Sequence, residues 1–312
     1  MCHVIVFSII YPGAYLHKVL IMKDLRQVTV IGLGLLGGSI TLRVLRSLPG
    51  VKTVGYTHRP STRSKAKQLA VATEIADDIN KSVSGADLVI LATPIHTFED
   101  IFGKIHDALS DGCIVTDIGS TKVLPHRWAA KKLPETIHYV GSHPIAGSEQ
   151  RGIEFARDDL FDQTTCILTT TKKTNRQAVQ TLNSFWSGLG CSVKLMTPTD
   201  HDRIFANISH LPHVVAAALI NSNNNDDLKF AGKGFIDTSR IASGPANIWA
   251  DVLLTNADNT TKGIDKIIAE LLKLKKAIKG RNKQQIENLL ETARKKRSTL
   301  INYKIKKEDL IS

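Results

Sequence analysis

Short apolar runs rich in β-branched residues recur along the first two thirds of the chain, separated by stretches with helical periodicity. They predict seven strands: VTVIG (28–32), VKTVGYT (51–57), DLVILATP (87–94), GCIVTDIGS (112–120), IHYVGSHP (137–144), TCILTTT (165–171) and CSVKLMTP (191–198). Strands at this spacing, with helices between them, are typical of βαβ units and a mainly parallel sheet.

The strand pattern stops near Thr199. Residues 198–223 predict a long helix with a kink at Pro212, residues 231–244 predict a glycine-bearing loop, and Pro245 stands at the start of another helix. Apolar positions within residues 263–280 lie mostly on one helical face, and one more helix follows. A helical half of this kind is thin, so we expect it to pack against a second copy of itself as a homodimer.

Composition and charge favour an ordinary globular protein, with 42% hydrophobic and 22% charged residues among 312. The net charge of +12 is concentrated near the end, where Lys and Arg outnumber Asp and Glu by 15 to 4 between Lys262 and Lys307. No nucleic-acid-binding motif accompanies this region, so we interpret it as a solvated helical face and predict no nucleic-acid partner.

The first 26 residues are predicted to be an N-terminal extension. Their apolar run of about eight residues is far shorter than the roughly 20 that span a membrane, and it lacks the features of a signal peptide. The four cysteines are scattered without a disulfide or metal-binding spacing. We therefore predict a cytoplasmic protein without a membrane anchor.

A glycine motif follows the first predicted strand and opens a helix. Gly32, Gly34 and Gly37 form G-x-G-x-x-G, which allows a tight turn and brings a dinucleotide pyrophosphate onto the helix N-terminus. We assign these glycines to the cofactor site with the intervening Leu35 and Leu36, and with Thr93 and Pro94 at the end of the third predicted strand. The fold class predicted is thus an α/β Rossmann-type dinucleotide-binding domain (27–199) followed by an all-α dimerisation domain (200–312).

The end of the second predicted strand bears on cofactor choice. It offers Thr57, His58, Arg59 and Arg63 where an NAD site usually has a carboxylate for the ribose. Arginine can bind a 2′-phosphate through charge-assisted hydrogen bonds, so NADP is slightly favoured over NAD. The alternative is that both arginines simply begin a solvated helix.

Ser120 and His143 follow the fourth and fifth predicted strands, at the edge where ligands bind in open α/β sheets. A hydroxyl bonded to one imidazole nitrogen would fix the tautomer and leave the other nitrogen as a base. Pro144 restricts the backbone of His143 to an extended conformation. Spacing alone leaves open whether His143 is catalytic or a strand-end histidine satisfied by the backbone.

Five blocks of the chain together resemble the prephenate and arogenate dehydrogenase family of tyrosine biosynthesis: VIGLGLLGGSI, VTDIGSTK, GSHPIAGSEQRGIEFA, ISHLPH and GKGFIDTSRIA. The resemblance runs from about residue 27 to the last helix. It implies an oxidative decarboxylation in which a cyclohexadienol gives a hydride to NAD(P) and loses CO₂. Prephenate would yield 4-hydroxyphenylpyruvate, and arogenate would yield tyrosine.

The resemblance also implies roles for individual residues. His143 matches the histidine that contacts the substrate hydroxyl, and Ser120 the serine that orients it. Arg240 matches the carboxylate-binding arginine, although a salt bridge within the helical domain is an alternative. Further substrate-binding positions implied by the resemblance are Ser148, Glu149 and His213.

Three other interpretations were weighed. His210 and His213 share a helical face, but no cysteine is near and the implied chemistry needs no metal, so we predict none. Trp249 is predicted to be a core residue rather than a substrate contact.

Two other functions compete with this interpretation. One is a β-hydroxyacid dehydrogenase or imine reductase, and the other is a non-catalytic dinucleotide sensor or nucleic-acid-associated protein.

Overall fold

The computed structural model describes residues 25–146 and 150–308. The chain divides into two compact units, one that ends at Ala257 and one that begins at Asp258. The predicted N-terminal extension lies outside the described residues except for its last two. The predicted domain boundary between residues 199 and 200 stays a prediction, since the larger unit contains the strands together with the first helices that follow them.

Six strands in the described part of the chain form a parallel sheet with the order β3-β2-β1-β4-β5-β6. Their bounds are β1 Gln27–Ile31, β2 Lys52–Tyr56, β3 Glu74–Ala76, β4 Leu88–Leu91, β5 Ile114–Asp117 and β6 His138–Tyr139. The chain changes direction across the sheet between β1 and β4, and ligands of open α/β sheets bind at such switch points. The short β3 is a strand that the sequence pattern did not predict.

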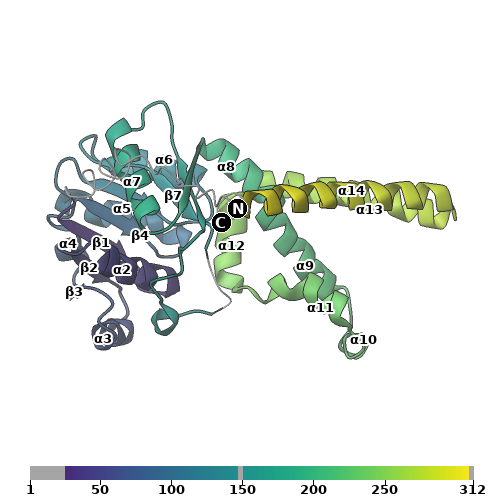
Figure 1. Ribbon diagram of the computed structural model, residues 1–312, viewed down its shortest axis with the longest axis horizontal. Coiled ribbons are helices and arrows are strands. Elements are labelled where there is room, and N and C mark those ends of the chain that lie inside the picture. The colour runs from purple at the N-terminus through teal and green to yellow at the C-terminus, as the bar shows by residue number, and fades with distance from the viewer. Residues whose placement is uncertain (1–24, 147–149, 309–312) are drawn as a thin grey trace, which may run out of the picture. The chain divides into compact units, whose positions relative to one another are not determined.

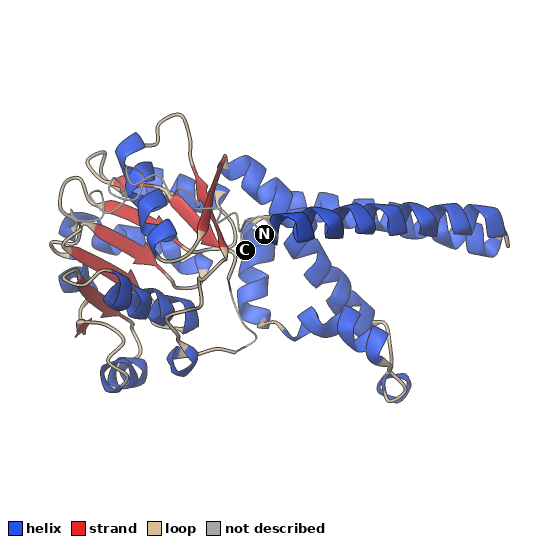
Figure 2. Ribbon diagram, in the orientation of Figure 1, coloured by secondary structure: helices blue, strands red, loops and turns tan. Residues whose placement is uncertain are grey.

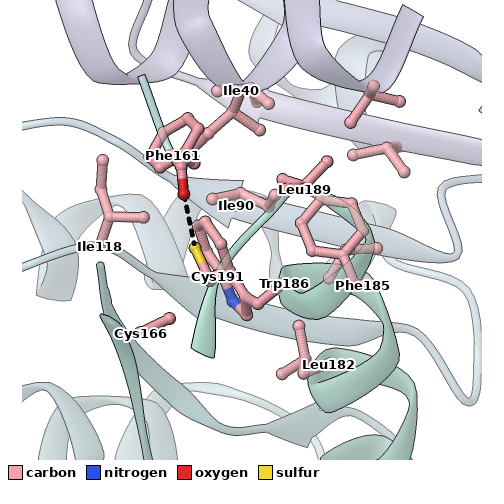
Figure 3. Packing of buried hydrophobic residues seen from close by; sticks show 14 of the residues in the cluster. Ile40, Ile90, Ile118, Phe161, Cys166, Leu182, Phe185, Trp186, Leu189 and Cys191 are labelled. Atoms are coloured by element: carbon pink, nitrogen blue, oxygen red, sulfur yellow. Dashed lines mark hydrogen bonds between the residues drawn. The ribbon is translucent and has the colours of Figure 1, made fainter. Parts of the chain in front are cut away.

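Both faces of this sheet are covered by helices, as Figure 2 shows. Along β4, Leu88 and Ile90 belong to one buried cluster, and the alternating Val89 and Leu91 belong to another. Figure 3 shows the first cluster, where Trp186 packs among aliphatic and aromatic side chains. The connecting helices are α2 Leu35–Ser47, α3 Pro60–Gln68, α4 Ile79–Val83, η1 Ile95–Thr97, α5 Phe98–Ile105, η2 His106–Ala108 and α6 Val123–Lys132.

A second, three-stranded sheet within the described residues corrects the prediction of a single strand over residues 137–144. The chain leaves the parallel sheet after β6 and enters β7, which pairs antiparallel with β8, while β8 pairs parallel with β9. Gly141 pairs with Thr169 across β7 and β8, and a Cβ on Gly141 would lie 2.6 Å from Thr169 Oγ1, so this glycine permits the close pairing of the two strands. The elements of this part are β7 Gly141–Pro144, η3 Ile153–Phe155, β8 Thr165–Thr169, α7 Arg176–Gly188 and β9 Ser192–Met196.

The predicted long helix over residues 198–223 consists of α8 Pro198–Phe205, η4 Ala206–His210 and α9 Leu211–Asn221. The irregularity expected at Pro212 takes the form of a π-helical turn, in which the Leu211 N–H donates to the carbonyl of Ala206. Proline has no N–H, so the helix loses one regular hydrogen bond at this point. π-turns within α-helices often occur at functional sites.

The predicted loop at residues 231–244 is mostly helical, and this is a second correction. It contains α11 Lys233–Ser239 and η5 Arg240–Ser243, preceded by α10 Asn225–Leu228 and followed by α12 Ala246–Thr255. Glycine has low helix propensity, which obscured the pattern, but Gly232 is the N-cap of α11 and lies outside its regular turns.

The smaller unit is a pair of long helices, α13 Ala257–Lys279 and α14 Lys283–Glu308, drawn from light green to yellow in Figure 1. The turn between them contains Arg281 with a positive φ of 48°. Large apolar side chains remain exposed on both helices: Ile268, Leu271, Leu272, Ile278, Leu290, Leu300, Ile301 and Tyr303.

Candidate active site

The glycine turn after β1 has the geometry of a phosphate-binding loop. Gly32 has a φ of 107°, and a Cβ on Gly37 would lie 1.9 Å from the carbonyl oxygen of Gly32, so both positions require glycine. A Cβ on Gly34 would meet nothing within 4 Å. Gly34 is also the N-cap of α2, and as a glycine it has no side chain with which to cap that helix end. The open space above uncapped N–H groups fits the pyrophosphate of a dinucleotide.

The loop after β2 is held by one of the two arginines predicted at this position. The Arg63 guanidinium donates to the carbonyl oxygens of Thr57 at 2.8 Å and His58 at 3.1 Å. Arg59 is exposed at the N-cap of α3. Arg63 thus shapes the loop, whereas Arg59 is the arginine whose charge is available to a ligand.

A cavity of about 530 Å³ lies over the glycine turn within the larger unit. Five of the predicted site residues line it, namely Gly34, Leu35, Leu36, Gly37 and Arg240. Trp249 and the segment from Gln150 to Gly152 also line it. The cavity is large enough for a small-molecule ligand, and it joins the predicted cofactor turn to the predicted carboxylate-binding arginine.

His143 is the end of a chain of hydrogen bonds that the sequence did not predict. Its Nδ1 lies 2.8 Å from Nε2 of His201, and Nδ1 of His201 lies 2.8 Å from Oδ1 of Asp202. The Asp202 carboxylate accepts from the backbone N–H groups of Lys122 at 2.7 Å and Val123 at 2.9 Å. A carboxylate can only accept, so His201 carries its proton on Nδ1 and accepts from His143 through Nε2. His143 therefore carries its proton on Nδ1, and its Nε2 is left with the lone pair of a base.

Both histidines of this chain are held neutral. Burial lowers the pKa of His143 well below its usual range, and the neighbouring His201, Lys122 and His210 lower it further. Burial also lowers the pKa of His201 to about 2, helped by the Lys122 charge. His143 is therefore neutral at cellular pH, the state in which one ring nitrogen has a free lone pair.

The charge of Lys122 is fully buried beside this chain. Its ammonium forms an ion pair with Asp117, and the Tyr139 hydroxyl donates to the other Asp117 oxygen at 2.5 Å. Burial raises the pKa of Tyr139 well above its usual range, and the Asp117 charge raises it further. Because each charged group has a partner, the cluster can hold in place the backbone N–H groups of Lys122 and Val123 that donate to Asp202.

A second cluster connects Asp202 to the cavity. The Asn256 amide donates to the backbone carbonyl of Asp202 at 2.7 Å and lies 3.2 Å from Nδ1 of His210. His213 stacks on Trp249, with ring centroids 3.7 Å apart and planes 9° apart. Trp249, predicted to belong to the core, packs against the core and also lines the cavity. The His210 ring lies edge-on to Trp249, with ring centroids 6.3 Å apart, and this contact joins the Asn256 cluster to the cavity wall.

The described residues that line the cavity do not include His143, nor do they include the predicted residues Ser120, Thr93 and Pro94. Burial lowers the pKa of His210 to about 4, and the backbone of Ser120 partly offsets this effect. The pairing of Ser120 with His143 stays a prediction. Thr93 Oγ1 lies 2.7 Å from Thr97 Oγ1, and Pro94 is exposed at the start of η1. Ser148 and Glu149 lie outside the described residues.

Sequence reasoning missed His201 and Asp202, although the pattern T-D-H-D at the start of a helix contains them. Neighbouring histidine and aspartate side chains at a helix N-terminus are a weak signal because such residues usually face solvent there. Both are buried in the structure, with 0% and 1% of the residue exposed. Among residues 25–146 and 150–308, no group of three His, Cys, Asp or Glu side chains is placed to hold a metal ion.

These features define a class of protein. A parallel sheet with this strand order, a glycine turn at a helix N-terminus and a neutral histidine held in one tautomer are those of a nicotinamide-dinucleotide-dependent dehydrogenase.

Comparison with known proteins gives the family. Residues 40–195 match the model of the prephenate dehydrogenase nucleotide-binding domain, and residues 197–295 match that of the prephenate dehydrogenase dimerization domain. A prephenate dehydrogenase of Bacillus subtilis is 33% identical over 286 residues, which cover 89% of this chain and 76% of that protein.

Two solved structures are similar over nearly their whole length. The prephenate dehydrogenase of A. aeolicus, in complex with hydroxyphenyl propionate and NAD⁺, has a TM-score of 0.83 and 33% identity, covering 89% of this chain and 99% of that chain. Arogenate dehydrogenase of Synechocystis has a TM-score of 0.76 and 30% identity, covering 88% and 99%. The chain belongs to the prephenate dehydrogenase family of NAD-dependent oxidoreductases, whose reaction is an oxidative decarboxylation in tyrosine biosynthesis.

Proposed function

We propose that this protein oxidises and decarboxylates prephenate or arogenate, with NAD(P) as hydride acceptor, to give 4-hydroxyphenylpyruvate or tyrosine. The observation that carries the proposal is the hydrogen-bond chain from Asp202 through His201 to His143. It supplies the one group that the reaction requires of the protein, a neutral base of fixed tautomer.

His143 acts as the base in this mechanism. Oxidation of the ring carbinol removes a hydride from carbon and a proton from the hydroxyl, and the nicotinamide supplies the hydride acceptor when it is bound. Nε2 of His143 takes the hydroxyl proton. The C–C bond to the ring carboxylate then breaks and CO₂ leaves. Its electron pair completes the aromatic ring and leaves a phenolate oxygen, which takes the proton back from the His143 imidazolium.

His201 and Asp202 support the protonated state of His143. When His143 becomes an imidazolium, its Nδ1–H donates to His201, whose own N–H donates to the Asp202 carboxylate. A hydrogen bond to a charged group is worth about 1.5–3 kcal/mol, roughly twice a neutral one. The chain therefore favours the transition state, in which charge develops on His143, over the ground state.

Substrate carboxylate binding is assigned to Arg240, which lines the cavity and is exposed at the end of α11. Its planar guanidinium can bind a carboxylate through two parallel hydrogen bonds, whereas lysine offers a point charge. Arg240→Lys is expected to raise KM for substrate about tenfold and to change KM for the dinucleotide little. We assign His213, Ser148 and Glu149 to the substrate side chain and Ser120 to the orientation of His143.

We favour NADP over NAD, since the loop after β2 presents Arg59 and no carboxylate at Thr57 or His58. Arg59→Ala is expected to raise KM for NADP about tenfold and leave KM for NAD unchanged, because only NADP has a 2′-phosphate to pair with the lost charge. Equal effects on both cofactors would contradict the assignment.

A homodimer is the proposed assembly. The helical run Pro198–Asn221 is long and apolar enough to cross a membrane by length and composition alone, with a mean hydropathy of 1.3 in its most apolar window. Only 28% of that window is buried within one chain, so most of this apolar surface is uncovered. The apolar residues on α13 and α14 are likewise exposed. A second copy covering these surfaces explains them, and light scattering is expected to give twice the monomer mass; a monomer at micromolar concentration would refute it.

The proposed compartment is the cytoplasm. Cys113, Cys166 and Cys191 are buried free thiols, and none of them forms a disulfide within the described residues. Proteins of oxidising compartments more often use such residues as cross-links.

Product analysis tests the proposed function. With prephenate as substrate, the account predicts one CO₂ and one 4-hydroxyphenylpyruvate for each reduced nicotinamide formed. Reduced nicotinamide without CO₂ would instead indicate a simple alcohol oxidation, as in a β-hydroxyacid dehydrogenase.

A further inference from the structure

Arg151 is a cavity-lining arginine that neither the glycine motif nor the histidine chain uses. It lines the same cavity as Gly34, Leu35, Leu36 and Gly37 at the N-terminus of α2. Its side chain is exposed and makes no hydrogen bond or ion pair in the part of the chain that the structure describes. Arg63, in contrast, is occupied by two backbone carbonyls.

The segment that follows Arg151 is fixed against α2. Gly152 turns the chain with a φ of 98°, and the next residue, Ile153, is buried in the core. The Arg157 backbone N–H donates to Ser39 Oγ on α2 at 2.9 Å, and a Cβ on Gly38 would lie 2.8 Å from the Cβ of Ala156. Arg151 is therefore anchored beside the first turns of α2.

The same segment also contacts the helix after β2. Glu154 forms an ion pair of 3.4 Å with Lys65 on α3. In a fold with this strand order, the adenosine half of a dinucleotide lies toward β2 and the pyrophosphate lies over the N-terminus of the first helix. Arg151 thus lies on a segment that contacts both α2 and α3, and the described residues lining the cavity include no Asp or Glu.

We propose that Arg151 is a dinucleotide-binding residue that contacts the pyrophosphate beside the N-terminus of α2. The phosphates would accept hydrogen bonds from the N–H groups of α2 and from a guanidinium, which binds two phosphate oxygens through parallel hydrogen bonds. This inference rests on the assignment of the glycine turn as the dinucleotide site. It gives the chain a second contact for the pyrophosphate from a segment about 115 residues away from the glycine motif.

Direct binding tests the proposal without turnover. Titration calorimetry would compare wild type, Arg151→Gln and the control Arg127→Gln, each with NAD⁺, NADP⁺ and ADP-ribose. All three ligands are expected to bind about tenfold more weakly to Arg151→Gln. Arg127 is an exposed arginine on α6, outside this cavity, and its variant is expected to bind like wild type.

Three results would overturn the assignment. Unchanged affinity in Arg151→Gln would remove Arg151 from the site. A loss confined to NADP⁺ would assign it to the 2′-phosphate, and unchanged dinucleotide affinity with a raised KM for substrate would assign it to a substrate carboxylate. Absence of binding in folded wild type would instead refute the dinucleotide site itself.

Discussion

Replacing His201 with leucine tests the role of the hydrogen-bond chain. The change removes the acceptor for Nδ1–H of His143, which lies 2.8 Å away, and removes the path to Asp202. The imidazolium that forms on His143 then loses a hydrogen bond worth about 1.5–3 kcal/mol, which corresponds to a factor of about 10 to 150 in rate. Because this bond gains strength only as His143 becomes charged, kcat is expected to fall while KM changes little.

The assay is steady-state formation of reduced nicotinamide at saturating substrate, with far-ultraviolet circular dichroism to confirm folding. His126→Leu is the matched control: His126 has its pKa lowered by burial to about 4, but its Nε2 lies 2.9 Å from Thr169 Oγ1 and does not contact His143. His201→Gln, which keeps an oxygen acceptor, is expected to recover part of the rate. An unchanged kcat in folded His201→Leu, or an equal loss in His126→Leu, would refute the reasoning.

The remaining predictions concern pH and the glycine turn. Burial lowers the pKa of His201 to about 2 and the pKa of His126 and His210 to about 4. In the unfolded chain each histidine binds a proton near its ordinary pKa of about 6.5. The free energy of unfolding should therefore fall as pH falls from about 6.5 toward 4. The loss between pH 6 and 5 is about 1 kcal/mol for each histidine, measurable by urea denaturation, and a stability independent of pH over this range would contradict it. Gly34→Ala is expected to fold normally and to bind NAD⁺ at least tenfold more weakly, since its Cβ enters open space at the phosphate-binding turn. Gly37→Ala should also lower the melting temperature, because its Cβ would lie 1.9 Å from the Gly32 carbonyl oxygen. Equal melting temperatures for the two variants would contradict this distinction.

Local sequence patterns were enough to predict the strands, helices and glycine turn that form the cofactor site. The alternation of β-branched runs and helices, together with the glycine motif, depends on residues that are close in sequence. The structure confirms a nucleotide-binding domain with a parallel sheet followed by helices, and it places the glycine turn at the N-terminus of α2. Resemblance to the family added the expected positions of His143 and Arg240.

Contacts between distant parts of the chain were not predictable in this way. His143 and His201 are 58 residues apart, and their hydrogen bond depends on the chain leaving the parallel sheet after β6 and pairing with β8 in a second sheet. Local propensity contains no information about this arrangement. The loop predicted in place of α11 has a different cause, because glycine at the N-cap, Gly232, and within the first turn, Gly234, obscured a helical pattern.

The most direct test of the account is the formation of reduced nicotinamide by wild type and His143→Asn, each with prephenate or arogenate and with NAD⁺ or NADP⁺. The account predicts turnover by wild type in at least one combination, with kcat about 10²- to 10⁴-fold lower in His143→Asn. Folded wild type that is silent in all four combinations, or a His143→Asn variant as active as wild type, would contradict the central claim.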